Sequence, residues 1–492
     1  MAALIVLLPL LPAVAAVVVG AFGWRASTAW LGPVTCVGVG GTGVALAVQV
    51  LDRGPLTALG DQLRVDSLSA LMIILIGGVG AIASTYSVAY LRTELERSAT
   101  TPPRARLYGA LMQLTISAML VVVIADNLGV IWVAIETTTI ATVLLVGHRR
   151  DRASVEASWK YLVLGSVGVA TALMGTVLVY FVSRHSGGDA ATALNWSSLV
   201  ARAPRLDPGA LRLAVGMVVV GYGAKAGLAP LHSWLPDAYS QAPAPVAALM
   251  AGVLSSMPMY ALLRIKVVAD IALGPGYVRN LLLVAALFSL ATAASLMVTQ
   301  RDYKRLLAYS SVEHMGLIAL AAALGSPLAM SAALLHMIGN GLAKSVAFST
   351  TGELLFTTGT TRIGDVRGLL HRRPFIGTTL ALSLVALLGL PPFSILASEL
   401  AIVRAGVAGG YTWAIAIALV LMLIIFTAMV VHALDMGAGP DEPATPAPPF
   451  ADHPTSAVAR VPIIAGLVVA ASLGVTIWPI SRLLSSAAQV LA

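Results

Sequence analysis

The chain of 492 residues is 58% hydrophobic and only 11% charged, with a mean hydropathy of +0.90. Soluble domains are typically about 45–50% apolar and about 25% charged. These proportions exclude a soluble, disordered, fibrous or disulfide-rich protein and predict a polytopic membrane protein. The net charge of +8 does not indicate a nucleic-acid partner, because the basic residues lie in short loops between apolar runs, where orientation signals belong.

The only cysteine, Cys36, lies inside an apolar run. One thiol cannot form a disulfide within the chain or hold a zinc or iron–sulfur centre. No metal or cofactor is therefore expected on this chain, and the redox centres of any parent complex would lie on other subunits. The first apolar run has no Lys or Arg before it and extends to about Gly20, which predicts a retained first helix rather than a cleaved signal peptide.

Long apolar runs dominate the sequence. A membrane-crossing helix needs about 20 mainly apolar residues, and the runs here do not alternate as barrel strands do. The sequence predicts an all-α integral membrane protein of about fourteen transmembrane helices. The predicted spans are 3–22, 27–50, 66–91, 107–125, 127–147, 158–182, 210–230, 243–269, 278–298, 305–324, 327–356, 375–406, 411–434 and 459–486.

Basic residues indicate the orientation of these spans. The loops on one side of the predicted bundle hold more Lys and Arg than the loops and tails on the other side, with clear clusters at 149–152 and 301–305. Because cytoplasmic loops are enriched in Lys and Arg, both termini are expected outside the cytoplasm. The Pro-rich, acidic stretch 437–456 is expected to be a linker without a packed core.

Two predicted spans contain prolines at membrane depth, in the segments 223–245 and 387–400. Proline removes a backbone donor, and the freed carbonyls are tolerated in a membrane only where protein or a water-filled cavity meets them. Paired interruptions in the two halves of a chain are typical of a transport site. Simple proline kinks are the alternative interpretation.

Ionisable residues inside predicted spans are costly and usually functional. His336, Asn340 and Lys344 recur every four residues and so share a helix face about 12 Å long. Burial favours neutral forms and a nearby opposite charge favours charged forms, so a Glu–Lys pair that opens and closes can capture and release a proton. Histidine is a natural relay. The alternative is a set of static salt bridges between helices. The predicted proton-translocating residues are Glu136, Lys225, Glu313, His314, His336, Lys344 and Glu399.

Other polar residues receive a structural interpretation. Three carboxylates near predicted span ends are expected to be solvated helix-end charges: Asp66, Asp126 and Glu353.

His232 and Asp237 lie in a turn and have no third metal ligand at a useful spacing, so loop packing is expected. The glycines of 38–44 have no strand before them and predict a helix-packing face rather than a phosphate-binding loop. No nucleophile and base stand together, so no catalytic residue is expected.

Several motifs carry a family resemblance. The stretches are WVAIE at 132–136, the long motif at 224–253, RDYKRLLAYSSVEHMG at 301–316, HMIGNGLAKSVAF at 336–348, and LGLPPF with the following Ser398-Glu399. The chain resembles the antiporter-like proton-translocating family. This family includes large membrane subunits of respiratory complex I, of Mrp-type Na⁺/H⁺ antiporters and of energy-converting hydrogenases.

The resemblance implies fourteen helices, two inverted five-helix repeats, and broken seventh and twelfth helices. In the family, protons enter from the cytoplasm, load the central lysine and leave on the side of the twelfth helix. The family's functional positions correspond to Glu136, Lys225, His336, Lys344 and Glu399. By this resemblance Glu136 and Lys225 are expected to form the proton-input pair, and Glu399 the exit. The implied division of the chain is 1–106 for helices one to three, 107–269 for the first repeat, 270–434 for the second, 435–458 for the linker and 459–492 for a single C-terminal helix.

The chain also departs from the family pattern. Ser255 and Ser256 stand where helix eight usually carries a basic residue, and Asn340 replaces a histidine. These three residues are possible links between the two half-channels. The Glu313-His314 pair in YSSVEHMG resembles the F-type membrane subunit of hydrogenase-4.

That branch implies a heteromeric complex in a prokaryotic-type energy-converting membrane, the cell inner membrane. The partners would be other membrane subunits and a peripheral hydrogenase-like module, which would hold the nickel–iron and iron–sulfur centres. The chain would be non-catalytic alone but part of a proton-pumping oxidoreductase. The alternatives are a subunit of an Mrp-type cation/proton antiporter and a non-conducting scaffold.

Overall fold

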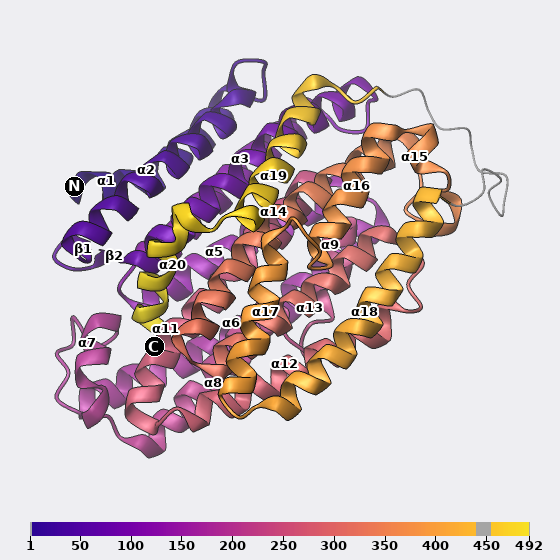
Figure 1. Cartoon of the computed structure of the whole chain (residues 1–492). Helices are drawn as coiled ribbons and strands as arrows, with labels where there is room; N and C mark the ends of the chain where they lie inside the picture. Colours follow the sequence, from indigo (N-terminus) through magenta and orange to yellow (C-terminus); the bar gives the residue numbers. More distant parts are fainter. Residues whose placement is uncertain (1, 439–453, 492) are drawn as a thin grey trace.

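The computed structural model describes residues 2–438 and 454–491, and nearly all of its elements are helices. Figure 1 shows the long helices lying side by side in one elongated bundle. Twelve helices of the described residues are long and apolar enough to cross a membrane. The predicted all-α membrane class is confirmed. The count of fourteen and the inverted repeats stay predictions.

The first helices pack through glycine. A Cβ on Gly77 would lie 2.5 Å from the backbone nitrogen of Gly40, and one on Gly43 would lie 2.9 Å from Ile73. Only glycine permits so close an approach of two helices, so the predicted packing face at 38–44 is confirmed. The elements here are α1 (Ala2–Phe22), η1 (Thr28–Trp30), α2 (Leu31–Arg53), β1 (Leu56–Ala58), β2 (Leu63–Val65) and α3 (Ser67–Glu96).

The first predicted break is confirmed. Helix α8 ends at Ala226, where Gly227 takes a positive φ of 88°, and the next helix begins only at Trp234. Glycine adopts this left-handed conformation at a helix end without steric cost. The elements of this region are α4 (Pro102–Ile124), α5 (Leu128–Val146), η2 (Gly147–Arg149), α6 (Arg152–His185), α7 (Trp196–Arg202), η3 (Ala203–Arg205), α8 (Pro208–Ala226), α9 (Trp234–Gln241), α10 (Ala244–Leu249), the π-helical turn η4 (Met250–Leu254) and α11 (Ser256–Leu273).

The second predicted break is confirmed as well. Helix α16 ends at Leu387 and α17 begins at Ser394, with Pro391 and Pro392 between them. Because the break divides one predicted span, neither helix is long enough alone to cross a membrane. The elements of this region are α12 (Gly276–Met297), α13 (Tyr303–Leu324), α14 (Pro327–Thr358), η5 (Ile363–Asp365), α15 (Leu369–Arg372), α16 (Pro374–Leu387), α17 (Ser394–Ala408) and α18 (Thr412–Ala438).

The C-terminal region corrects one prediction. The sequence predicts a single helix, whereas the structure has α19 (Ala457–Val475) and α20 (Trp478–Leu491). Pro479 lacks the backbone donor that a continuous helix needs, which accounts for the interruption. Most of the predicted linker, residues 439–453, lies outside the described residues.

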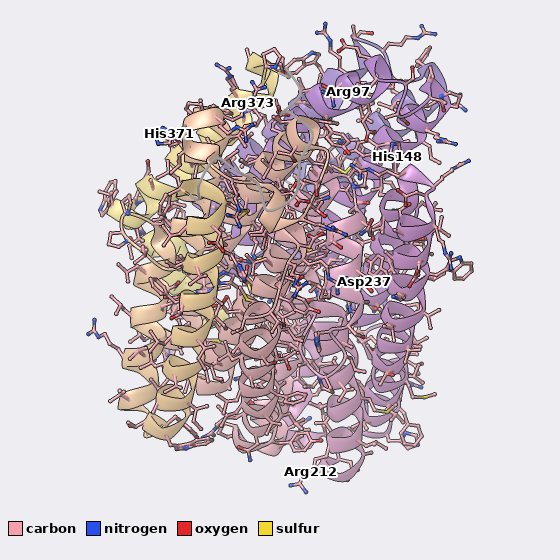
Figure 2. All side chains as sticks on the ribbon, turned by 90° about the vertical axis from the view of Figure 1, so that its right-hand side faces the viewer. Arg97, His148, Arg212, Asp237, His371 and Arg373 are labelled. Carbon is pink, nitrogen blue, oxygen red and sulfur yellow. The ribbon has the colours of Figure 1, made fainter. Side chains whose placement is uncertain are left out.

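The bundle has two ends. Figure 2 shows Arg97, His148, His371 and Arg373 at one end and Arg212 at the other. The first end, which we call the His148 end, is the one predicted to face the cytoplasm.

Candidate functional site

Lys225 lies in the last turn of α8, next to the first break, and its side chain is buried. Its Nζ donates a hydrogen bond of 2.7 Å to the hydroxyl oxygen of Tyr161 on α6. The same Nζ lies 4.3 Å from the Tyr161 ring centroid and 5.5 Å from that of Trp234. The two rings stack at 4.7 Å. Aromatic faces attract an ammonium, so this cage can hold the charged lysine without a carboxylate.

Glu136 is half-buried on α5 and forms no ion pair with Lys225, since no carboxylate of the described residues lies within 4.0 Å of that Nζ. One carboxylate oxygen of Glu136 accepts a bond of 3.4 Å from Ser166, and the other is buried without a hydrogen-bond partner in the described part of the chain. Next to Ser166, a Cβ on Gly165 would lie 3.7 Å from Nζ of Lys225. Glu136 and Lys225 thus lie against neighbouring residues of α6: Glu136 bonds to Ser166, and Lys225 lies beside Gly165.

Tyr161 connects Lys225 to α5. Its hydroxyl lies 2.8 Å from Thr142 Oγ1, and Thr142 donates to the carbonyl of Thr138 at 2.6 Å. Tyr161 and Thr142 are not among the residues predicted from the sequence. Their position inside predicted spans was the available signal, because a hydroxyl at membrane depth needs a partner.

Lys344 on α14 is fully buried. Its Nζ donates to the carbonyl of Leu307 at 2.7 Å and to Oγ of Ser310, both on α13. Like Lys225, it is held by neutral oxygens only, within the residues that the structure describes.

A histidine pair lies beside this lysine. Nδ1 of His314 lies 3.0 Å from Nε2 of His336, and Nδ1 of His336 lies 2.9 Å from Oγ of Ser398. Ser398 donates its hydroxyl hydrogen to the carbonyl of Ile395 at 2.7 Å. Both rings are fully buried. The predicted residues His314 and His336 are therefore in direct contact.

The hydrogen-bond pattern assigns the neutral tautomers of this row. Because the Ser398 hydrogen is used, Nδ1 of His336 must donate to Ser398 and Nε2 of His336 must accept. Nδ1 of His314 is then the donor between the rings. Nε2 of His314 is left as an acceptor, and it is buried with no partner among the described residues.

The two remaining carboxylates flank this row. Glu313 is buried and interacts electrostatically with Lys344 and Glu399, without an ion pair. Glu399 reaches back across the second break, since a Cβ on Gly389 would lie 2.2 Å from its Oε2. The structure thus gathers Glu313, His314, His336 and Lys344 on α13 and α14, with Glu399 adjacent on α17.

Aromatic rings fill the space between the two lysines. Trp234 meets Tyr239 at 6.1 Å and Tyr239 meets Phe348 at 6.1 Å, and Phe348 lies one helical turn from Lys344. The predicted links are also buried: Ser255 and Ser256 directly follow the π-helical turn η4, and the side-chain oxygen of Asn340 has no hydrogen-bond partner in the described chain.

Three carboxylates expected to be solvated are buried, which corrects the prediction. Asp66 accepts bonds of 2.6 and 2.8 Å from the guanidinium of Arg264. Asp126 accepts from Ser197 at 2.6 Å, and Glu353 accepts from Tyr86 at 3.1 Å. The partner of each carboxylate is distant in sequence or on another element, so spacing alone could not reveal it. All three side chains, those of Asp66, Asp126 and Glu353, are therefore buried and hydrogen-bonded rather than solvated.

Asp237 does more than pack a turn. It lies on α9 and forms ion pairs with Lys160 at 3.2 Å and with Arg305 on α13. Figure 2 places it between the two ends of the bundle. Lys304, in the basic cluster at 301–305, is buried and donates to the carbonyls of Ser240 and Ala242 near the first break.

These features define a class: a polytopic membrane protein with buried ionisable side chains near two broken helices. Comparison with known proteins identifies the family. The model described as "NADH:quinone oxidoreductase/Mrp antiporter, TM" matches residues 125–426, and that of the complex I chain 5 N-terminus matches residues 59–98. The chain belongs to this NADH:quinone oxidoreductase/Mrp antiporter family.

Two known proteins resemble the chain over more than two thirds of its length. The chain is 38% identical to the "Hydrogenase-4 component F homolog" of Methylacidiphilum infernorum over 340 residues, 69% of this chain and 71% of the relative. It is 32% identical to NADH-quinone oxidoreductase subunit N of Desulforudis audaxviator over 68% of this chain and 64% of the relative.

Solved structures share the fold. A chain of an archaeal membrane-bound sulfane sulfur reductase superposes with a TM-score of 0.86 at 24% identity, covering 100% of this chain and 97% of that one. A chain of the Mrp complex from Dietzia sp. DQ12-45-1b superposes with a TM-score of 0.81 at 22% identity, covering 99% and 97%.

Proposed function

We propose that the chain is a proton-translocating, antiporter-like membrane subunit of a redox complex related to hydrogenase-4. The observation that carries the proposal is the pair of buried lysines, Lys225 and Lys344, each bonded only to neutral oxygens among the described residues. A lysine without a carboxylate partner is not fixed in its charged form, so it can give up a proton and regain it. The 38% identical component F homologue supports the hydrogenase-4 branch.

Proton loading would occur at Lys225. While Glu136 bonds to Ser166, the ammonium depends on Tyr161 and the aromatic cage. If Glu136 turns around α6 toward Lys225, the added negative charge stabilises the ammonium and promotes proton uptake. Return of Glu136 to Ser166 withdraws that charge and favours release.

Onward transfer would use the histidine row. A proton arriving from the Lys344 side meets the free acceptor, Nε2 of His314. Transfer from Nδ1 of His314 to Nε2 of His336 then moves the charge, and Nδ1 of His336 passes a proton toward Ser398. Glu399 would receive it near the second break, and Glu313 would stabilise the charge in transit.

Water beside Ser255, Ser256 and Asn340 would connect the two lysines. The unpartnered side-chain oxygen of Asn340 and the buried serine hydroxyls provide polar groups for such water. The aromatic row from Trp234 to Phe348 would limit proton passage to this polar side.

The same proposal includes the arrangement of the chain. Residues 107–269 and 270–434 would form the two inverted repeats, after helices one to three in 1–106 and before the linker 435–458 and the C-terminal region. Both termini would lie outside the cytoplasm, and the membrane would be the cell inner membrane. A peripheral module with nickel–iron and iron–sulfur centres would drive the movement of Glu136.

Purification with native partners in mild detergent tests the complex. We expect mass spectrometry to find other membrane subunits and iron–sulfur proteins, and metal analysis to find nickel and iron. Recovery with small membrane subunits alone and no metal would contradict the redox proposal.

Proton pumping by Lys225→Met tests the path. We expect assembled complex with coupled pumping in vesicles lowered by about 100-fold or more, the usual contribution of a proton-transferring group. Lys266→Met is the matched control, because Lys266 is a buried lysine that pairs with Asp270 away from the site. Unchanged pumping by Lys225→Met would contradict the proposal.

A cation/proton antiporter is the second candidate, favoured by the fold likeness to the Mrp complex chain. It predicts sodium-dependent proton flux without an electron donor. Flux that requires electron transfer and ignores sodium would exclude it.

A further inference from the structure

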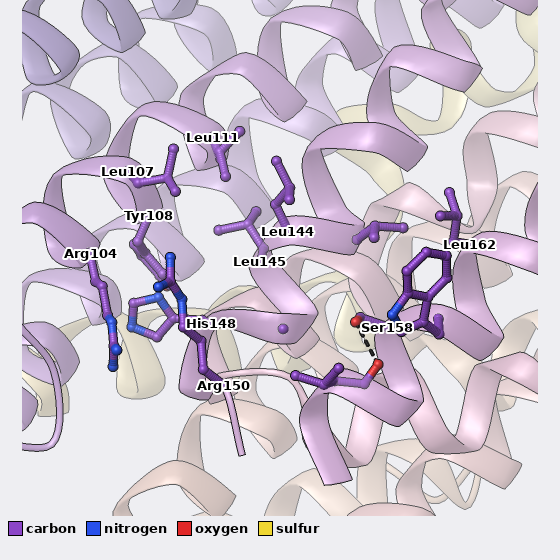
Figure 3. A pocket seen from close by; sticks show the side chains of 14 residues that line it. Arg104, Leu107, Tyr108, Leu111, Leu144, Leu145, His148, Arg150, Ser158 and Leu162 are labelled. Atoms are coloured by element: carbon purple, nitrogen blue, oxygen red, sulfur yellow. Dashed lines mark hydrogen bonds between the residues drawn. The ribbon is translucent and has the colours of Figure 1, made fainter. Parts of the chain in front are cut away.

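We propose that a groove between α4, α5 and the start of α6 binds one anionic phospholipid at the His148 end of the bundle. The groove is distinct from the lysine path and has a volume of about 340 Å³. Figure 3 shows Arg104, Arg150 and His148 gathered at one end of the groove, with Leu107 and Leu144 along its wall.

Three arginines supply the headgroup site. Arg104 and Arg150 line both this groove and an adjoining hollow, to which Arg106 also contributes. No carboxylate within 4.0 Å accompanies any of the three in the residues that the structure describes. By contrast Arg92, at the same end, is paired with Glu96. Guanidinium groups left without carboxylates on one rim are suited to the bidentate hydrogen bonds that phosphate oxygens accept.

The floor of the groove does not compete for the phosphate. His148 is buried and pairs with Glu94 at 3.4 Å, and Thr100 lies 3.3 Å from the same ring nitrogen. Glu94 is not among the residues that line the groove or the adjoining hollow, so the attraction for an anion comes from the arginines on the rim. Charge complementarity therefore favours an anion at the rim.

The walls select a lipid over a soluble anion. Leu107, Leu144 and Trp159 are 45%, 53% and 61% exposed, although they line the groove. Soluble phosphate would leave these surfaces uncovered, whereas the acyl chain of a phospholipid covers them. Tryptophan is enriched where membrane meets water, and basic pockets between helices on the cytoplasmic side bind anionic headgroups.

Fluorescence quenching by brominated lipids tests the site in the membrane-reconstituted protein. The fluorescence of Trp159 is obtained by subtracting the emission of the Trp159→Phe variant from that of the unmodified chain. We expect brominated phosphatidylglycerol to quench it at lower mole fraction than brominated phosphatidylcholine. The ratio of the two mole fractions should be about fivefold for each arginine that contacts the headgroup, equivalent to about 1 kcal/mol. This preference should weaken with added salt.

Arginine variants locate the headgroup. Arg104→Gln and Arg150→Gln are each expected to lower the preference, and the triple variant that adds Arg106→Gln is expected to remove it. Arg212→Gln at the opposite end is the control and should retain it. Equal quenching by the two lipids would overturn the proposal, as would loss of the preference in millimolar inorganic phosphate at constant ionic strength. Absence of Trp159 quenching in the assembled complex, which would mean that a neighbouring subunit covers the groove, would also overturn it.

Discussion

The buried ion pair of Asp66 and Arg264 and the two buried lysines of the proposed path differ in whether their charge can change. Asp66 and Arg264 satisfy each other through two short hydrogen bonds at the end of α3, whereas Lys225 and Lys344 lie deep in the bundle with neutral partners. Desolvation raises the pKa of Asp66, but the Arg264 guanidinium, the backbone N–H of Ser69 and Arg64 together outweigh it and leave the pKa below its usual value. A matched pair holds helices together. A lysine among neutral acceptors is free to change its charge.

The largest expected effect comes from fixing the charge of Lys344. Lys344→Arg keeps a cation that cannot release its proton, so we expect pumping to fall by about 100-fold or more while assembly is retained. Proton flux into vesicles measures this, with Lys266→Arg as the control. Full pumping by Lys344→Arg would mean that the charge is only structural, as it is at Arg264.

Breaking the matched pair should affect stability rather than transport. Arg264→Met removes the two short hydrogen bonds to the buried Asp66 carboxylate and leaves it only the longer ion pair with Arg64 at 3.7 Å, which costs about 3–5 kcal/mol. We expect a lower yield of assembled protein and a lower unfolding temperature, with normal pumping per assembled complex. Arg212→Met, on an exposed arginine, should change neither. Stable protein that no longer pumps would place Arg264 in the proton path.

Removing the Tyr161 hydroxyl tests whether a neutral hydrogen-bond partner supports the charge of Lys225. Tyr161→Phe keeps the aromatic cage but deletes a hydrogen bond to a charged group, worth about 1.5–3 kcal/mol. We expect pumping to slow by roughly tenfold. Tyr277→Phe is the control, because its hydroxyl bonds the carbonyl of Arg212 at the other end. An equal loss in both variants would indicate general destabilisation.

The smallest effect is expected at Ser398. Ser398→Ala removes the acceptor of His336 Nδ1, a bond worth about 0.5–1.5 kcal/mol, and should slow pumping a few-fold with a larger solvent isotope effect. Ser383→Ala, which deletes a buried hydroxyl bonded only to the carbonyl of Leu380, should leave the isotope effect unchanged. An unchanged isotope effect in Ser398→Ala would remove the histidine row from the path.

Sequence reasoning succeeds here where one segment contains the signal. Apolar run length predicts the spans, and Pro391 with Pro392 predicts the second break, because both depend on neighbouring residues. The ionisable residues could be chosen because charge at membrane depth is costly.

The failures involve partners that are distant in sequence. The sequence does not indicate that Asp66 is buried and paired, because its partner Arg264 is 198 residues away. The contact between His314 and His336 could not be foreseen from the spacing of either helix alone. Glu136 was expected to meet Lys225, and only the placement of α6 shows Tyr161 and Ser166 as their actual partners.

Solid-state nitrogen-15 NMR of lysine-labelled protein in membranes tests most directly whether the buried lysines exchange protons. The chain has five lysines, at 160, 225, 266, 304 and 344, so their signals can be assigned by single substitutions. We predict a neutral-amine signal that is lost in Lys225→Arg or Lys344→Arg, while the signal of Lys266, paired with Asp270, stays that of an ammonium. Ammonium signals alone for Lys225 and Lys344, at rest and during turnover, would contradict the proposed proton path.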